Sequence, residues 1–169
     1  MRTATHLPAA VVIRSADAEL IDFPDGSVMR LLADSSATGG KLSIHRTTLP
    51  AGAAGAGPHH HTRIAEVFYV LRGSVEILVD DEVVIAHEGD FASVPPGVAH
   101  AFGATPEGAA EVLVAITPGI DRFDLFRQVA RVLAGNEPAG TLLTDQSPYD
   151  TYPDESAAWQ QARHPQETP

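Results

Sequence analysis

The chain has 169 residues, eight histidines, no cysteine and a net charge of -11 at pH 7. The lack of cysteine excludes disulfides, thiolate metal ligands and cysteine nucleophiles. The acidic balance argues against nucleic acid and anionic membranes as partners, because proteins that bind them gather Lys and Arg on one surface. The longest early apolar run, residues 9–13, is too short for a signal peptide or a spanning helix, so we expect a cytoplasmic protein.

Short apolar runs separated by glycine and proline fill the chain up to residue 116, a pattern typical of strands. The predicted strands are 11–14, 28–32, 41–49, 67–71, 75–79, 83–86, 91–94, 100–102 and 111–116. Their close spacing favours an all-β sandwich or barrel over alternating strands and helices.

The apolar period changes after Gly119, where Ile120, Phe123, Phe126 and Val129 recur every three or four residues. This period predicts an amphipathic helix, whose apolar stripe we expect to pack on the outside of the barrel. Residues 137–169 are acidic and contain five prolines, which indicates a surface extension, with one more short helix over 156–163.

Three consecutive histidines, His59, His60 and His61, begin the most informative stretch. Side chains alternate faces along a strand, so His59 and His61 point together and His60 points away. A hairpin to the next apolar run would bring the carboxylate of Glu66 beside the paired imidazoles. A proline and glycine turn then precedes His100, the fourth polar residue of the group.

These imidazoles and the carboxylate would be costly to bury in an apolar barrel without a partner. A divalent transition metal ion supplies that partner, and imidazole and carboxylate suit iron, nickel, manganese, zinc or copper. The alternative is an exposed triple histidine together with a His100 that is an ordinary core residue.

The pattern His59-x-His61-x4-Glu66-x6-Gly73 resembles the first motif of the cupin superfamily, and Gly89-x5-Pro95-x-Gly97-x2-His100 resembles the second. Fifteen residues separate the two, as in small single-domain bacterial cupins of the cupin_2 type. Ala53 and Ala104 stand where the motifs usually have glycine and asparagine.

The resemblance implies a double-stranded β-helix, the cupin jelly-roll barrel, with a C-terminal amphipathic helix. We expect N-terminal strands over 1–36, the barrel over 37–118, the helix over 119–136 and the acidic extension over 137–169. By the same resemblance the metal ligands are His59, His61, Glu66 and His100, and Glu66 is also the candidate catalytic residue.

Strand alternation predicts which residues line a pocket beside the metal. The expected lining is mostly apolar, and the residues are Arg46, Thr48, Phe68, Val70, Ile77 and Phe102. Arg46 could hold a substrate carboxylate, although a lone arginine more often makes a surface ion pair. The apolar members could equally be barrel-filling residues.

Fold does not determine function in this superfamily. We expect a metal-dependent enzyme, a dioxygenase or other oxygenase, acting on a small apolar or aromatic oxygenated molecule. The alternatives are a non-redox cyclase, isomerase or decarboxylase, and a non-catalytic cupin that binds a small molecule through its metal. Because sheet edges are commonly covered, we expect a homodimer.

Overall fold

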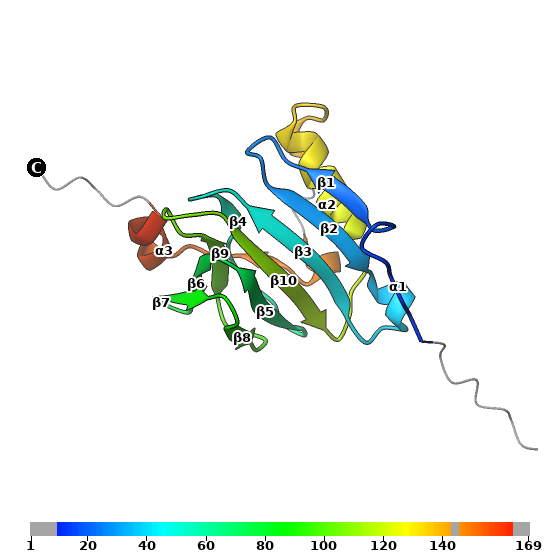
Figure 1. Cartoon of the computed structure of the whole chain (residues 1–169), viewed down its shortest axis with the longest axis horizontal. Coiled ribbons are helices and arrows are strands. Elements are labelled where there is room, and N and C mark those ends of the chain that lie inside the picture. The colour runs from blue at the N-terminus through cyan, green and yellow to red at the C-terminus, as the bar shows by residue number, and fades with distance from the viewer. Residues whose placement is uncertain (1–9, 143–145, 164–169) are drawn as a thin grey trace, which may run out of the picture.

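The computed structural model describes residues 10–142 and 146–163. Within them, the strands form two antiparallel sheets that face each other (Figure 1). The first sheet has the order β1-β2-β3-β10-β5-β8, with β1 (Glu19–Asp22), β2 (Val28–Ala33), β3 (Ser43–Leu49), β10 (Ala110–Thr117), β5 (Ala65–Arg72) and β8 (Phe91–Val94). The second has the order β11-β4-β9-β6-β7, with β11 (Tyr152–Pro153), β4 (Ala54–His60), β9 (His100–Ala104), β6 (Ser74–Val79) and β7 (Glu82–His87).

The predicted all-β jelly-roll architecture is confirmed. Of the predicted strands, 11–14 is wrong, because that segment is not in a strand. The sequence pattern missed β1 and also β4, whose glycine and alanine content is typical of a loop. Glycine is needed in β4 because a Cβ at Gly55 would come 2.2 Å from the ring of Phe102 in the neighbouring strand β9.

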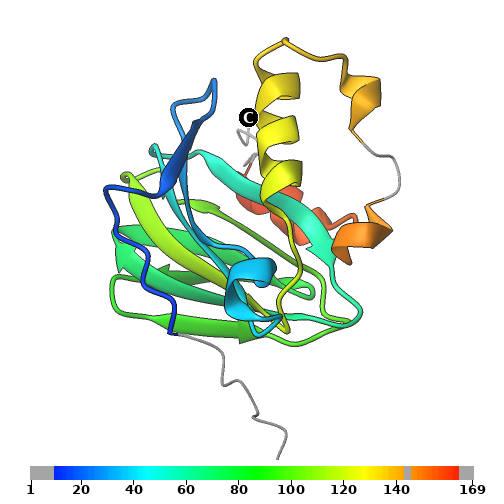
Figure 2. The same ribbon diagram turned by 90° about the vertical axis from the view of Figure 1, so that its right-hand side faces the viewer.

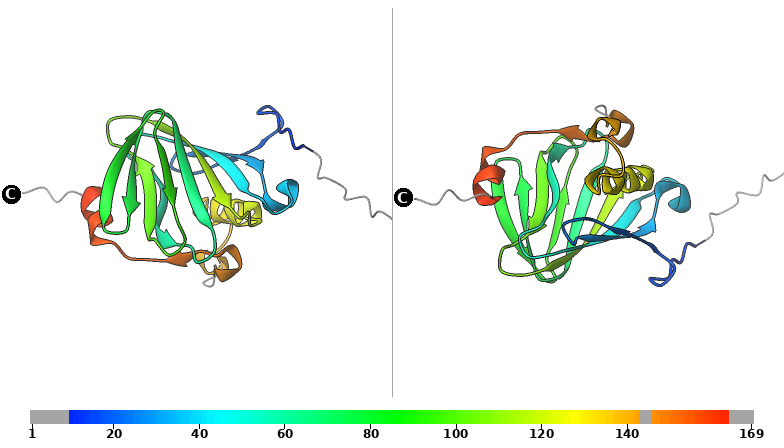
Figure 3. Two further views of the ribbon diagram at one scale, coloured as in Figure 1. Left: turned by 90° about the horizontal axis from the view of Figure 1, so that it is seen from below. Right: turned by 90° about the horizontal axis from the view of Figure 1, so that it is seen from above.

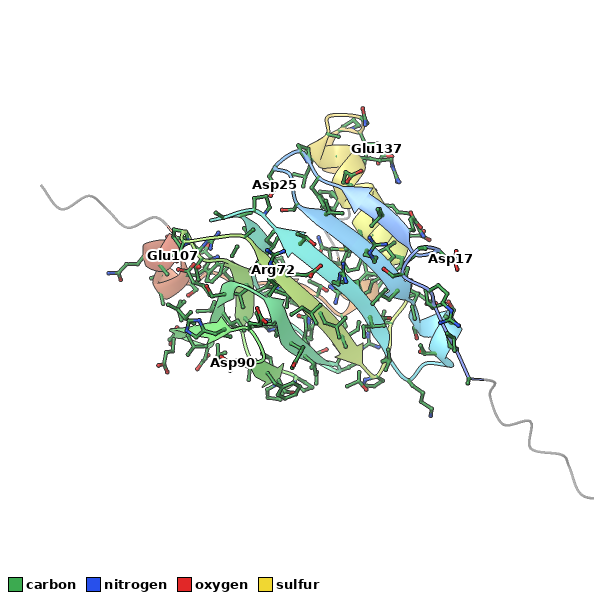
Figure 4. The ribbon with its side chains drawn as sticks, in the orientation of Figure 1. Asp17, Asp25, Arg72, Asp90, Glu107 and Glu137 are labelled. Carbon is green, nitrogen blue, oxygen red and sulfur yellow. The ribbon has the colours of Figure 1, made fainter. Side chains whose placement is uncertain are left out.

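The core lies between the two sheets. Alternate residues of β3, β5 and β10 point into it, and β6 contributes Val75 and Ile77, which are completely buried. The outer face of the first sheet carries both polar and apolar side chains, among them Arg46 of β3 and the exposed Tyr69 of β5, and Figure 4 marks the exposed Arg72 at the end of β5. The buried apolar layer holds the two sheets together and fixes which face of each strand points inward.

Helix α2 (Phe123–Leu133) forms where the period predicts it, but it does not pack on the outside of the barrel as expected. In Figure 1 it lies behind β1 and β2, and Figure 2 shows it standing beside the barrel. Its residues Leu125, Phe126 and Val129 line a cavity that also touches β3 and β4. The apolar stripe is therefore a wall of the cavity. A shorter helix, α1 (Ser35–Thr38), precedes β3.

The segment after α2 runs along one side of the barrel (Figure 3). It contains the 3-10 turns η1 (Ala139–Thr141) and η2 (Ser147–Tyr149), then β11 and α3 (Ala157–Arg163). The buried Trp159 of α3 packs with Leu78 and Ala101, and Arg163 makes a 2.8 Å ion pair with Glu76. These contacts cover the outer face of β6, which explains why that strand is buried on both faces.

Within the described residues, no helix combines the length and the apolar character needed to span a membrane.

Gly73 in the turn between β5 and β6 gives the first prediction. Its φ is +73°, and a Cβ there would come 2.3 Å from the carbonyl oxygen of Ala109. We expect Gly73→Ala to lower the free energy of unfolding by about 1–3 kcal/mol, because strain and a steric clash combine. Urea denaturation measures the change. Gly108→Ala is the matched control, since nothing lies within 4 Å of its added Cβ; equal stability of the two variants would contradict the prediction.

Candidate metal centre

Four polar side chains converge between the two sheets. His59 lies in β4, His61 directly follows that strand, Glu66 lies in β5 and His100 begins β9. All four are buried, and one ligand atom from each lies within 4.8 Å of the others. The structure thus brings together the four residues that the sequence resemblance identifies.

Glu66 reaches the imidazoles in a different way from the one expected. Strands β4 and β5 belong to different sheets, so they do not form a hairpin. His59 and His100 are direct partners across the β4–β9 pair, and Glu66 faces them across the barrel. The cluster therefore bridges the two sheets.

Each of the three imidazoles donates its Nδ1–H to a backbone carbonyl. The acceptors are Gly57 O for His59 at 2.8 Å, Asp150 O for His61 at 2.6 Å, and Val98 O for His100 at 2.9 Å. A carbonyl oxygen can only accept, so Nδ1 must carry the proton. Each Nε2 is then free to act as a ligand, which is the usual arrangement of metal-binding histidines.

The three Nε2 atoms point at one carboxylate oxygen. Oε2 of Glu66 lies 2.7 Å from His100 Nε2, 3.3 Å from His61 Nε2 and 3.7 Å from His59 Nε2. With Nδ1 protonated on each neutral ring, four groups with free lone pairs face one another, and a positive charge must sit among them. The nitrogen and oxygen donors suit a divalent transition metal ion, so the residues present fit such an ion.

The buried groups of the cluster have shifted pKa values. Burial alone would raise the pKa of Glu66, but the hydrogen bonds that His100, His59 and His61 donate from Nε2 when a ring is protonated there outweigh it and hold that pKa well below its ordinary value. Burial lowers the pKa of His59, against the opposing effect of the Glu66 carboxylate. These two shifts favour an ionised Glu66 beside a neutral His59, the protonation states that metal ligands require.

His60 points out of the cluster, as strand alternation predicts. Its Nδ1 lies 2.7 Å from Asp154 Oδ2, and its ring stacks on Tyr152 at 5.3 Å between centroids. His60 therefore holds β11 against β4 and takes no part in the metal centre.

Asp150 supports the centre although nothing in the sequence pattern points to it. Its side chain is fully buried and accepts hydrogen bonds from the backbone N–H groups of Thr62, Arg63 and Ile64. Its own carbonyl oxygen orients His61. Burial would raise the pKa of this carboxyl, but these donors and the Thr62 hydroxyl lower it to about 2. Asp150 thus fixes the turn between the two ligands His61 and Glu66.

A cavity of about 580 Å³ opens beside the cluster and includes His59 and Glu66 in its wall. Most of the lining is apolar. One acidic residue of the lining, Asp25 of the β1–β2 turn, lies at the end of the molecule that also carries Glu137 (Figure 4). The polar residues at its inner part include His45, Thr47 and Arg122, all buried. None of these three residues is predicted from the sequence to line the site.

The prediction that Arg46 and Thr48 line the pocket is wrong. Both lie on the outer face of the first sheet, where Arg46 makes a 2.8 Å ion pair with Glu111 and Thr48 donates to the same carboxylate at 3.3 Å. Alternation along β3 correctly separates two sets of side chains, and the inward set is the one with His45 and Thr47. Periodicity alone does not say which face of a strand is covered.

Of the four expected apolar residues, one lines the cavity, namely Phe102. Phe68, Val70 and Ile77 lie within the core cluster, each at most 1% exposed, outside the cavity wall. Phe68 still touches the centre, because its ring stands 6.2 Å from that of His100. These three therefore fill the barrel beneath the cluster.

The fold and the four convergent side chains define a β-barrel protein whose cluster could hold a metal ion. The family model described as "Cupin domain" matches residues 45–116, which include all four residues of the cluster. With both motifs and the jelly-roll fold in place, residues 45–116 form a cupin domain.

Solved structures agree with this assignment. KdgF from Halomonas sp. is 20% identical, with a TM-score of 0.58 over 69% of this chain and 99% of that one. A predicted oxalate decarboxylase from Thermotoga maritima is 26% identical, with a TM-score of 0.55 over 63% and 98%. The polyketide cyclase RemF from Streptomyces resistomycificus is 18% identical, with a TM-score of 0.53 over 65% and 80%. No curated protein matches the sequence.

Removal of single ligands tests the metal centre. We expect about one transition metal ion per chain in the wild type and far less in His59→Ala, His61→Ala, Glu66→Gln and His100→Ala, because each loses one donor. Elemental analysis of protein purified without chelators or nickel columns measures the content. His60→Gln is the matched control and should retain the metal; loss of metal from this variant alone would contradict the assignment.

His45 makes the stability of the protein depend on pH. Burial lowers its pKa to about 4 from 6.5, with the charge of Arg122 adding to the effect and that of Glu66 opposing it. The unfolded chain thus takes up a proton at a higher pH than the folded protein, and stability falls as the pH drops from about 7 to 4.

Between pH 7 and pH 4 the free energy of unfolding of the wild type should fall by about 3 kcal/mol more than that of His45→Gln, which lacks the titrating group. Urea titrations of both proteins, each treated with a chelator, give the difference. Parallel pH profiles would show that His45 is not held neutral.

Proposed function

We propose that the protein is a metal-dependent enzyme that acts on a small, largely apolar, oxygenated molecule. The observation that carries this proposal is the position of the His59–His61–Glu66–His100 cluster at the wall of the 580 Å³ cavity, where a bound molecule would meet it. Cavities of this size, mostly apolar and with a few polar groups, are typical of sites for small molecules.

The chain's own residues would bind and orient the molecule. Leu125, Phe126 and Phe102 offer apolar surface and exclude water, while Glu66 and His59 reach the cavity from the cluster. A divalent ion held by the cluster would act as a Lewis acid toward substrate oxygens, and iron or manganese would add redox chemistry.

Oxygenase chemistry is the first candidate reaction, in agreement with the expectation from the sequence. The three-histidine, one-carboxylate donor set suits redox-active ions, and the apolar lining suits an aromatic or diketone substrate. Oxygen consumption coupled to product formation is the property that distinguishes this candidate.

Non-redox chemistry, such as cyclisation, isomerisation or decarboxylation, is the second candidate, and His45 favours it. The ring lies in the cavity wall 5.0 Å from that of Phe126, and burial lowers its pKa to about 4, so the imidazole is neutral at pH 7. At this pKa the ring is a weak base, but as a neutral imidazole it can donate a hydrogen bond to a substrate oxygen on which negative charge develops. The structural neighbours include a polyketide cyclase and a predicted oxalate decarboxylase, which agrees with chemistry of this kind.

Turnover with and without oxygen decides between the two candidates. Protein reconstituted with iron, nickel, manganese or cobalt would be incubated with a catechol, a flavonol and a β-diketone, and products followed by mass spectrometry. An oxygenase should consume oxygen in step with product, and a non-redox enzyme should work equally well in an anaerobic chamber. His59→Ala should abolish product in either case, because it removes a metal ligand.

The same experiment can reject the proposal. Ligands recovered unchanged with every metal, despite tight binding, would favour the non-catalytic binding protein. His60→Gln serves as the control for turnover, because its side chain lies outside the cluster.

A further inference from the structure

Arg122 is a buried arginine directly before α2, at the inner part of the cavity. Its side chain is only 7% exposed and forms part of the cavity wall together with His59 and Glu66. The backbone N–H groups of Arg122 and Phe123 donate to the carboxylate of Asp34, at 3.0 to 3.1 Å. Asp34 therefore fixes the first turn of α2 and, with it, the position of the Arg122 side chain.

The guanidinium of Arg122 lacks the partners that a buried charge requires. Its Nε has no hydrogen-bond partner, and its Nη2 reaches only Thr151 Oγ1, at a long 3.5 Å. The guanidinium lies over the ring of Phe126, 5.4 Å from the centroid. An arginine this deeply buried normally makes charge-assisted hydrogen bonds, often to a carboxylate.

The nearby carboxylates do not fill this role. Glu66, Asp34 and Asp150 all attract the guanidinium. Glu66 faces the three histidines of the cluster, and each aspartate is occupied by backbone N–H donors. Among the described residues, no carboxylate oxygen comes within the 4.0 Å of an ion pair with Arg122. The donor groups of Arg122 are therefore available to something else.

A second unpartnered polar group faces the same cavity. Thr47 on the inward face of β3 is 3% exposed, and its Oγ1 has no hydrogen-bond partner. Arg122 and Thr47 come from elements that are far apart in sequence, yet both lie in the wall of one cavity. Leaving such groups unpaired in the protein interior is unfavourable, and more so for a charged group than for a neutral one.

We propose that Arg122 and Thr47 form a subsite that binds a carboxylate of the substrate, beside the metal centre. Arg122 would donate its free N–H groups to the carboxylate and Thr47 its hydroxyl, while the apolar wall surrounds the rest of the molecule. The inference rests on the proposed function, because the metal centre would hold the other end of the same molecule.

A single carboxylate fits this cavity better than a phosphate. Arg122 is the only Lys or Arg among the described residues of the wall, so one positive charge is available for the anion. A doubly charged phosphate at Arg122 would leave one negative charge unpaired in a mostly apolar wall that also contains Asp25, which is costly.

Benzoate is a suitable probe, and benzamide is its neutral counterpart of the same shape. We expect zinc-loaded wild type to bind benzoate in calorimetric titration and to bind benzamide at least about tenfold more weakly. Arg122→Gln should weaken benzoate binding about tenfold or more, because charge-assisted hydrogen bonds are lost. Thr47→Val should weaken it several-fold, and Arg122→Lys should restore part of the affinity lost in Arg122→Gln.

Arg46→Gln is the matched control, because Arg46 lies on the outer face of the same sheet in an ion pair with Glu111. It should bind benzoate as the wild type does. Thermal melting of each variant checks folding, and Thr47→Val carries the test if Arg122→Gln does not fold.

Two results would overturn the subsite: equal benzoate affinity in the wild type and the tested variant, or no saturable benzoate binding to the wild type. Zinc content measured on the same samples separates this failure from that of the proposed function. A wild type that takes up no zinc contradicts the metal-dependent function, whereas benzoate binding independent of Arg122 and Thr47 contradicts the subsite.

Discussion

The structure depends on four electron-pair donors, three imidazole nitrogens and one carboxylate, that converge in the middle of an apolar barrel. Because Gly57, Val98 and Asp150 each accept the Nδ1–H of one histidine, three Nε2 atoms are left to face the carboxylate of Glu66. Such an arrangement repels itself unless a cation is shared among the four groups. The backbone carbonyls thus set both the tautomer and the direction of each ligand before any ion binds, which lowers the cost of ordering them.

This cluster also links the two sheets. Glu66 comes from the first sheet and His59 and His100 from the second, so a cation bound between them would act as a cross-brace in the core. The large cavity beside the cluster removes apolar contacts that would otherwise hold the sheets together at this end. Helix α2 replaces part of this packing, with Leu125 buried against the open side of the barrel.

Much of this site could be predicted from sequence because its signals are local. The spacing of His59, His61 and Glu66 and the turn before His100 identify the ligands, and strand alternation correctly turns His60 away. The same alternation gave the wrong face for β3, where Arg46 was expected inside and Thr47 is found there. Both sets on β3 contain polar and apolar residues, so hydrophobicity could not distinguish the faces.

The features of the site that could not be predicted are contacts between residues far apart in the sequence. Asp150 lies 86 to 89 residues from the backbone and side-chain groups that it holds near His61, and Arg122 enters the cavity from a helix expected on the outer surface. Proline and acidic content predict an extension over 137–169. They do not predict where this segment packs on the barrel. The position of a segment outside the barrel depends on tertiary packing, and the periodicity of apolar residues within the segment does not determine it.

The C-terminal segment contacts the metal centre through the backbone carbonyl of Asp150, which accepts the Nδ1–H of His61. Binding of the segment orients His61, so affinity for the ion and affinity of the segment for the barrel are linked, and each must strengthen the other by the same factor. A change that separates this segment from β4 would weaken binding of the ion. Removal of the ion would in turn weaken docking of the segment. An ion held by the cluster and the docked residues 146–163 would therefore stabilise each other.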